Sequence, residues 1–190
     1  MIPRRRFVLL APLGAFAAVD AALWLLPGEA PGLIAYGPHG VASPLLGRRL
    51  PSFSLPGLGS AGGFSSSDVV GSGHPVLLNF FASWCEPCQQ EMPVLLRLAR
   101  QGAAIWGIDF RDRTADAEGF LRQRGDPYRR VARDDQGQVA RLFGIDGVPE
   151  SFLVDPSGIV RWHWVGGLDD AIVPHQLEPL LRPQTPLLRA

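Results

Sequence analysis

The sequence predicts an α/β fold in which helices cover both faces of a central mixed sheet. Two short, almost continuously apolar runs, Val76–Phe81 and Ala104–Phe110, are typical of strands that are buried on both faces. Segments with helical patterning follow both runs, and this alternation of strands and helices is expected of an α/β protein. Near the carboxyl end, two strand-like segments flank a turn, so at least one pair of strands is antiparallel.

The elements follow in a regular order along the chain. After the first strand we expect a helix over Glu86–Gln101, which Pro93 kinks and Gly102 ends. The later elements expected are the strand 104–110, a helix over 115–124, a weak strand over 128–132, a short helix over 138–143, the hairpin strands 151–154 and 159–165 around the turn 155–158, and a last helix over 169–181 that two prolines disturb. The Gly/Ser-rich segment 60–67 is expected to be a loop.

The amino terminus predicts a membrane anchor. Arg4, Arg5 and Arg6 precede residues 7–26, which are apolar except for Asp20. Twenty helical residues, at about 1.5 Å each, cross a hydrocarbon core of about 30 Å. The basic cluster keeps residues 1–6 cytoplasmic and exports the remainder. A cleaved signal peptide is the alternative, because residues 7–19 have the length of its apolar region.

These features divide the chain into four parts. We expect a cytoplasmic stub and signal-anchor helix over 1–26, a Pro/Gly-rich tether over 27–50, a folded domain over 51–182 and a tail over 183–190. The folded domain then faces the periplasm, and the anchor lies in the inner membrane.

Composition excludes several classes of function. All 18 basic residues are arginine, so Schiff-base catalysis and a phosphate-binding P-loop lysine are excluded. Two cysteines are too few for a disulfide-dense scaffold or a four-cysteine metal site. Basic and acidic residues are equal in number, and no basic stripe alternates with aromatic residues, so nucleic-acid binding is not expected.

Both cysteines lie in the segment Trp84–Cys88, directly after a predicted strand and at the beginning of a predicted helix. A helix N-terminus presents unpaired N–H groups and about half a positive charge, which stabilise a thiolate and lower the pKa of a thiol placed there. We therefore expect Cys85 to be the exposed nucleophile. Cys88, one turn further along, is expected to resolve the mixed disulfide.

Other interpretations of the cysteine pair are weaker. A structural disulfide across two residues closes too small a loop to stabilise the chain much. A zinc half-site would need partners among scattered histidines, namely His39, His74, His163 and His175, and we expect no metal site. Attachment of a c-type haem is excluded, because Gln89 stands where that motif has histidine.

The segment Leu77–Cys88 resembles the active-site segment of thioredoxin-like proteins, and Pro93 matches their kinking proline. Gly147–Phe152 resembles the loop that carries their cis-proline. More narrowly, the chain resembles the membrane-tethered CcmG/DsbE group, thiol-disulfide proteins of cytochrome c maturation. The matching segments are 43–47, 50–56, 107–112 and the pair 149–150. The Glu-Pro pair between the cysteines is also similar to ResA-type reductants, while Arg111 and Ser151 replace the lysine and threonine usual in the group.

The resemblance implies a thioredoxin-like fold and a site around the dithiol. Val148-Pro149 would be cis, would offer backbone groups to an extended substrate segment, and would keep metal away from the sulfurs. Glu150 would lie near the sulfurs. Trp84 would shield Cys85 and line the docking surface, with core packing as the alternative. No cofactor is implied, and the partners would be apocytochrome c or a maturation thiol protein, and a transmembrane electron donor.

Acidic residues near the dithiol predict a reductant. Asn79 stands where thioredoxins usually carry a buried aspartate, and it cannot relay a proton. Glu86 lies between the cysteines, and negative charge beside a thiolate raises the thiol pKa and disfavours the reduced form. Glu86 could instead be a first-turn residue that favours the helix dipole, and Glu150 could be a solvated loop charge.

Other polar and aromatic residues are assigned to structure. Glu91 is expected on the surface, and the strand residues Trp162, His163 and Trp164 are assigned to packing. Asp109 and Asp112 could lie near the site or serve as loop and capping residues.

We therefore expect an enzyme, a membrane-anchored periplasmic thiol-disulfide oxidoreductase that reduces the disulfide of apocytochrome c or of its thiol partner. Three alternatives stay open. The protein could be a general envelope thiol reductant, a Cu(I) relay that uses both cysteines as soft ligands, or a non-catalytic module that captures unfolded apocytochrome.

Overall fold

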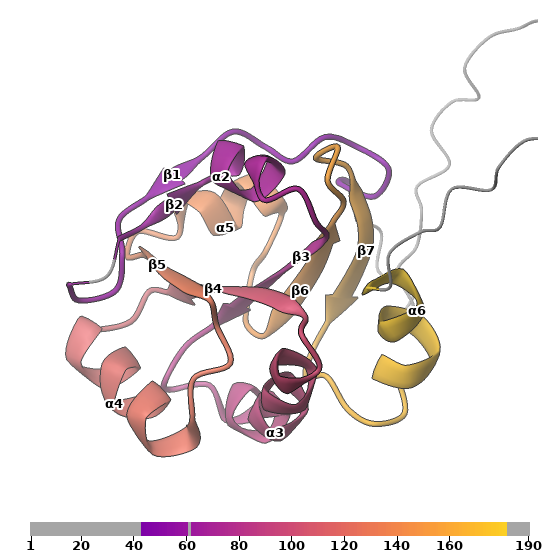
Figure 1. Ribbon diagram of the computed structural model, residues 1–190. Coiled ribbons are helices and arrows are strands. Elements are labelled where there is room, and N and C mark those ends of the chain that lie inside the picture. Colours follow the sequence, from indigo (N-terminus) through magenta and orange to yellow (C-terminus); the bar gives the residue numbers. More distant parts are fainter. Residues whose placement is uncertain (1–42, 61, 182–190) are drawn as a thin grey trace, which may run out of the picture. The chain divides into compact units, whose positions relative to one another are not determined.

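The computed structural model describes residues 43–60 and 62–181, and its centre is a five-stranded sheet. The strands lie in the order β5 (Arg130–Asp134), β4 (Ala104–Phe110), β3 (Val76–Phe81), β6 (Glu150–Val154) and β7 (Val160–Val165). β3, β4 and β5 are mutually parallel, whereas β6 is antiparallel to both β3 and β7. The predicted mixed sheet is thereby confirmed (Figure 1).

The apolar runs of β3 and β4 explain why these strands lie at the centre. Every residue of both strands is buried. Successive side chains of a strand point to opposite faces, so Leu77 and Phe81 join one apolar cluster while Leu78 and Phe80 join the other. A strand that is apolar on both sides needs a layer of other elements over each face.

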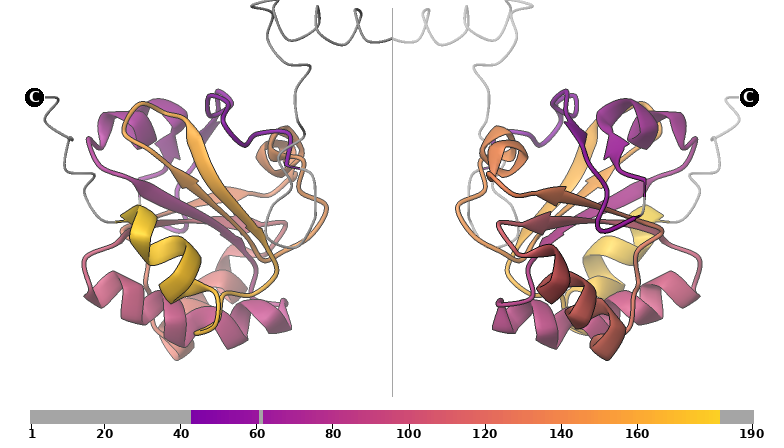
Figure 2. Two further views of the ribbon diagram at one scale, coloured as in Figure 1. Left: turned by 90° about the vertical axis from the view of Figure 1, so that its right-hand side faces the viewer. Right: turned by 90° about the vertical axis from the view of Figure 1, so that its left-hand side faces the viewer.

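Helices and a small sheet supply these two layers. One face is covered by α3 (Glu86–Arg100), α4 (Thr114–Arg124) and the π-helical segment η1 (Val173–Leu177), which α6 (Glu178–Leu181) continues. The other face is covered by α5 (Gln138–Phe143), α2 (Ser66–Gly71), and the hairpin of β1 (Ser54–Leu55) and β2 (Phe64–Ser65). The side views separate the two layers (Figure 2).

Several boundaries differ from the sequence prediction. The segment 60–67 was expected to be a loop, but it contains β2 and the start of α2. Ser65 begins this helix with a capping box, since its side chain accepts from the Asp68 N–H and the Asp68 carboxylate accepts from the Ser65 N–H. The weak strand 128–132 lies two residues later, at β5, and the last helix is a π turn followed by one α turn.

Part of the predicted tether packs on the domain. The Gly47 N–H donates to the Val160 carbonyl and the Val160 N–H donates to the Arg48 carbonyl, each at 2.9 Å. Leu45 is buried in the apolar cluster of the α5 face. The packed chain therefore begins before Leu50, where the prediction placed the boundary.

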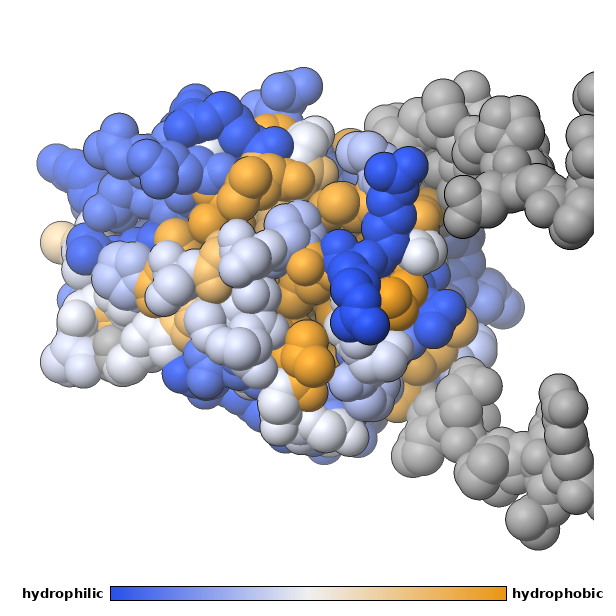
Figure 3. All heavy atoms as spheres, turned by 90° about the horizontal axis from the view of Figure 1, so that it is seen from above, coloured by the Kyte–Doolittle hydropathy of each residue, from blue (hydrophilic) through white to orange (hydrophobic). Residues whose placement is uncertain are grey.

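The predicted anchor, residues 1–26, the rest of the tether up to residue 42, and the tail lie outside the described residues. Within residues 43–60 and 62–181 no helix has the length and apolar character needed to cross a bilayer. The face that carries β1, β2 and α2 mixes hydrophilic and hydrophobic surface (Figure 3). Val70 of α2 is among the exposed apolar side chains.

Phe143→Ala should lower the free energy of unfolding by about 3–5 kcal/mol, because it leaves a cavity in the core. The Phe143 ring is 1% exposed and makes edge contacts with Phe53, Phe80 and Phe152. Leu142→Ala is the matched control, because this adjacent side chain is 53% exposed. Urea unfolding of both variants provides the measurement. Equal losses for the two would contradict the core assignment.

Candidate active site

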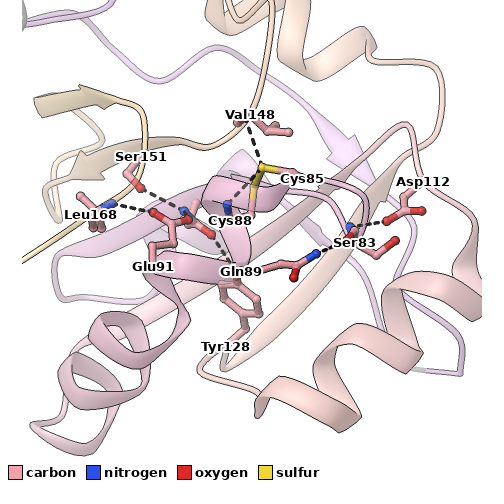
Figure 4. The surroundings of a disulfide bond; sticks show 11 residues. Ser83, Cys85, Cys88, Gln89, Glu91, Asp112, Tyr128, Val148, Ser151 and Leu168 are labelled. Carbon is pink, nitrogen blue, oxygen red and sulfur yellow. Dashed lines mark hydrogen bonds between the residues drawn. A yellow bond between two sulfur atoms is a disulfide. The ribbon is translucent and has the colours of Figure 1, made fainter.

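Cys85 and Cys88 form a disulfide at the point where β3 ends and α3 begins (Figure 4). Cys85 is the N-cap of α3, and its sulfur accepts a hydrogen bond from the Cys88 N–H at 3.2 Å. The predicted placement at a helix N-terminus is therefore confirmed. The expected exposure of Cys85 is wrong for this oxidised form, because Cys85 is 4% exposed and Cys88 1%.

The loop before β6 lies against the first cysteine. The Val148–Pro149 bond is cis, as the resemblance implied. The Val148 carbonyl oxygen lies 3.4 Å from the Cys85 sulfur, so the backbone of this loop reaches the reacting atom directly (Figure 4). A protonated Cys85 thiol could donate to this carbonyl, whereas the disulfide sulfur has no proton to give.

Trp84 lies beside the dithiol and is 58% exposed, so core packing does not explain it. Its indole N–H donates to the Arg111 carbonyl at 3.4 Å, and its ring lies 6.5 Å from the Phe110 ring. The loop after β4, which includes Arg111 and Asp112, also holds the residue before Trp84. The Asp112 carboxylate accepts a hydrogen bond from the Ser83 N–H at 2.6 Å. Asp112 thus positions the backbone that leads into Cys85.

Glu91 was expected on the surface, and this expectation is wrong. The side chain is 1% exposed, and both of its oxygens accept hydrogen bonds (Figure 4). Oε1 accepts from the Asn79 amide at 3.0 Å and Oε2 accepts from the Leu168 N–H at 2.9 Å. Asn79 also donates to Ser151 Oγ and accepts from the Tyr128 hydroxyl. A polar network therefore connects α3 with β3, with β6 and with the loop that precedes β5.

This network perturbs the ionisation of Glu91. Burial raises the pKa of Glu91 to about 7, and the hydrogen bonds from Leu168 and Asn79 oppose the shift without cancelling it. Residues three apart on a helix share a face, so Glu91 lies one turn after Cys88 on the buried side of α3. A carboxyl that changes charge near neutral pH is therefore adjacent to the resolving cysteine.

Glu150 lies on the opposite face of the sheet. It is buried, and its Oε2 lies 2.7 Å from His163 Nε2, so it is not a solvated loop charge. In the β6–β7 register Glu150 is opposite Val165, which places His163 in the diagonal position on the same face. The prediction assigned His163 to packing alone, and its ring does stack on Phe152 at 4.1 Å.

Glu86 is exposed at the first position of α3, where its carboxylate accepts from the Gln90 amide at 3.4 Å. A carboxylate at this position interacts favourably with the helix dipole, and it also follows Cys85 directly. The geometry is therefore compatible with Glu86 as a first-turn helix residue and with Glu86 as a charge that raises the thiol pKa.

Asp109 is a further buried carboxyl, and its burial was not predicted from the sequence. It is 1% exposed, and within residues 43–60 and 62–181 neither oxygen has a hydrogen-bond partner. Burial raises the pKa of Asp109 to about 8, with further contributions from the charges of Asp112 and Asp135, while Arg133 opposes the shift. Asp109 is therefore protonated at neutral pH.

The described residues include no group of three or more His, Cys, Asp or Glu side chains arranged to hold a metal ion. The groups that the structure brings together here are the two sulfurs, the Val148 carbonyl that lies against Cys85, and the buried Glu91 on the helix of the dithiol. This set suits the exchange of a disulfide with a partner.

Several known proteins are similar to this chain. The model of the AhpC/TSA family matches residues 46–163. The thiol:disulfide interchange protein DsbE of Escherichia coli strain K12 is 37% identical over 177 residues, which cover 93% of this chain and 94% of that protein. The thiol:disulfide interchange protein HelX of Rhodobacter capsulatus is 35% identical over 144 residues, which cover 76% of this chain and 81% of that protein.

A crystal structure of a thiol:disulfide interchange protein of the thioredoxin family from Chlorobium tepidum is also similar. It is 27% identical, with a TM-score of 0.59, and the match covers 70% of this chain and 96% of that one.

Glu91→Gln should remove an inflection near pH 7 from the pH dependence of disulfide exchange. Above this pH, the wild-type Glu91 is negative and can take up the Cys88 proton, which glutamine cannot, so the variant should react more slowly there. Rates measured on both sides of neutrality with a small disulfide provide the test. Glu118→Gln, on α4, is the control, and an unchanged profile in Glu91→Gln would remove this carboxyl from the site.

Asp109→Asn should flatten the decline of stability at rising pH. Because the folded pKa of about 8 exceeds the ordinary 3.8, the stabilisation from protonated Asp109 is complete below pH 3.8 and is lost as pH rises through 8. The upper limit of this loss is about 1.4 kcal/mol per pH unit. Urea unfolding at several pH values measures it, with exposed Asp146→Asn as control. Parallel slopes for Asp109→Asn and the wild type would contradict the assignment.

Proposed function

Because this chain belongs to the AhpC/TSA family of thioredoxin-like proteins, and within it to the DsbE group of thiol:disulfide interchange proteins, we propose that it reduces a protein disulfide during cytochrome c maturation. The chain is a thiol-disulfide oxidoreductase. The substrate would be apocytochrome c or a thiol protein that serves it. The observation that carries the proposal is the Cys85 sulfur, which lies between the Cys88 N–H and the Val148 carbonyl.

The reaction moves two electrons to the substrate. In the reduced protein the Cys85 thiolate attacks one sulfur of the substrate disulfide, forming a mixed disulfide and releasing the other sulfur, which takes up a proton. The Cys88 thiolate then attacks the Cys85 sulfur. This step closes the Cys85–Cys88 disulfide and releases the second substrate thiolate, which is protonated in turn. A reduced dithiol of a transmembrane donor would restore the protein by the same exchange in reverse.

The site favours each of these steps. The Cys88 N–H and the N-terminal end of α3 stabilise negative charge on Cys85 during attack. Val148 and Pro149 offer backbone groups to an extended substrate segment, and Trp84 supplies an exposed aromatic surface beside them. Glu91 lies one turn after Cys88, where it can take up the Cys88 proton as the second step begins.

The carboxylates support the direction of electron flow. Negative charge from Glu86, which follows Cys85 directly, and from Glu91, one turn after Cys88, disfavours a thiolate, and so disfavours the reduced form. A dithiol whose reduced form is less favoured gives up electrons more readily. The protein would therefore act as a reductant rather than an oxidant.

We also propose that the protein works at the periplasmic face of the inner membrane. The support is the sequence of residues 1–26, a basic cluster followed by an apolar run. Held by this anchor and by the chain between it and Ser43, the domain would meet membrane-bound maturation proteins at a raised effective concentration.

Cys88→Ser should trap the partner, because the mixed disulfide on Cys85 then has no resolving thiol. Expression of the tagged full chain, acid quenching and non-reducing electrophoresis should show an adduct that reductant releases, and mass spectrometry should identify its partner peptide. Cys85→Ser is the matched control and should give no such adduct.

The absence of an adduct in Cys88→Ser would contradict the reductase proposal. Tight one-to-one binding of Cu(I) by the reduced protein, without turnover of disulfides, would support the copper relay instead.

A further inference from the structure

A cavity of about 440 Å³ lies between the cis-proline loop and the start of α3, and it carries charges that the exchange reaction does not require. Its lining comes from five parts of the fold: Pro44, the start of α3, the end of α5, the cis-proline loop, and the first residues of β6 with the last of β7. Small-ligand pockets span about 300–1,000 Å³, so this cavity is at the lower end of that range. It suits a single side chain better than a cofactor.

One residue of the lining also contacts the reacting sulfur. Val148 lines the cavity, and the carbonyl oxygen of the same residue lies 3.4 Å from Cys85 Sγ. Pro87, one of the two residues between the cysteines, lines it as well. A substrate segment that pairs with the backbone of the cis-proline loop therefore has neighbouring side chains within reach of the cavity.

Two carboxylates line the cavity, that of the buried Glu150 and that of the exposed Asp146. His163, which pairs with Glu150, lines it as well, whereas no arginine does. His163 Nε2 holds Glu150 Oε2 at 2.7 Å, and within the described ranges no hydrogen bond reaches Oε1. One carboxylate oxygen is thus fixed by the protein, and the other is left for a donor that enters the cavity.

The walls of the cavity are apolar. Pro44, Phe143 and Val165 line it together with Pro87 and Val148. Apolar walls with a carboxylate fit a side chain that has an aliphatic stem and a cationic end, since lysine and arginine bury the stem and direct the charge to a polar group. An acidic side chain would be repelled by Glu150. An apolar one would cover the carboxylate without pairing it, which is costly.

We propose that this cavity is a subsite for a lysine or arginine side chain of the partner polypeptide, close to the disulfide that Cys85 attacks. The inference rests on the proposed reductase function and adds a preference for partner sequence. His163 acts as a positioning residue, because it fixes the orientation of the Glu150 carboxylate.

The test uses the reduced full-length protein and short peptides that each contain one disulfide. The peptides differ at one residue, which is lysine, norleucine or glutamate, and this residue is moved through the positions that flank the cysteine. At one position, lysine should increase the second-order rate constant about tenfold over norleucine, equivalent to about 1.4 kcal/mol. Added salt should weaken this preference, because it screens the ion pair.

Variants then assign the preference to the cavity. Glu150→Gln should bring the lysine-to-norleucine ratio close to one, and the exposed Asp146→Asn should lower it in part. Glu118→Gln removes a carboxylate of α4 that pairs with Arg122, and it should leave the ratio unchanged. A change of thiol reactivity in Glu150→Gln alters all peptides equally, so the ratio isolates the subsite.

The outcomes distinguish a failure of the subsite proposal from a failure of the reductase proposal. Reduction of every peptide at equal rates, a preference for norleucine or glutamate, or a lysine preference that survives both variants would overturn the subsite and leave the reductase intact. Failure to reduce any peptide would overturn the reductase, and the subsite with it.

Discussion

The end of β3 is the constraint on which the site depends. All six residues of β3 are buried, and the strand is fixed between β4 and β6. The chain therefore emerges at the carboxyl end of β3, and α3 begins there. Cys85 caps that helix, and the Cys88 N–H meets its sulfur at 3.2 Å. The first N–H groups of a helix have no partner within the helix, and one of them here forms a hydrogen bond with the Cys85 sulfur.

The sheet separates two buried glutamates, Glu91 on the helix that follows the dithiol and Glu150 in the cavity at the cis-proline loop. Glu91 reaches one face from α3, where Asn79 and Leu168 hold both its oxygens. Glu150 begins β6 and turns to the other face, where His163 holds one oxygen. The first is fully paired by the domain and changes charge near pH 7, while the second keeps an oxygen available in a cavity. The two carboxyls thus suit different tasks, proton transfer and recognition.

Local patterns were enough to predict the strand, the helix and the dithiol between them, because each depends on neighbours in the sequence. Glu91 was assigned wrongly, although its spacing of three from Cys88 and four from Leu95 puts it on the buried stripe of α3. The pair Glu150–His163 depends on the register of β6 and β7, which no local pattern gives. The small hairpin of β1 and β2 was missed because two-residue strands carry almost no periodicity.

Pro44 has a consequence for how the domain can be studied. It lines the cavity at the cis-proline loop, and it lies close to Gly144 at the C-terminal end of α5, since a Cβ added to that glycine would be 3.5 Å from its ring. A recombinant fragment cut at the sequence-based boundary of Leu50 would retain the cysteines and the sheet but lose one wall of that cavity. Such a fragment would exchange disulfides with less discrimination between partners, so fragments intended for crystallography or kinetics need to start upstream of Ser43.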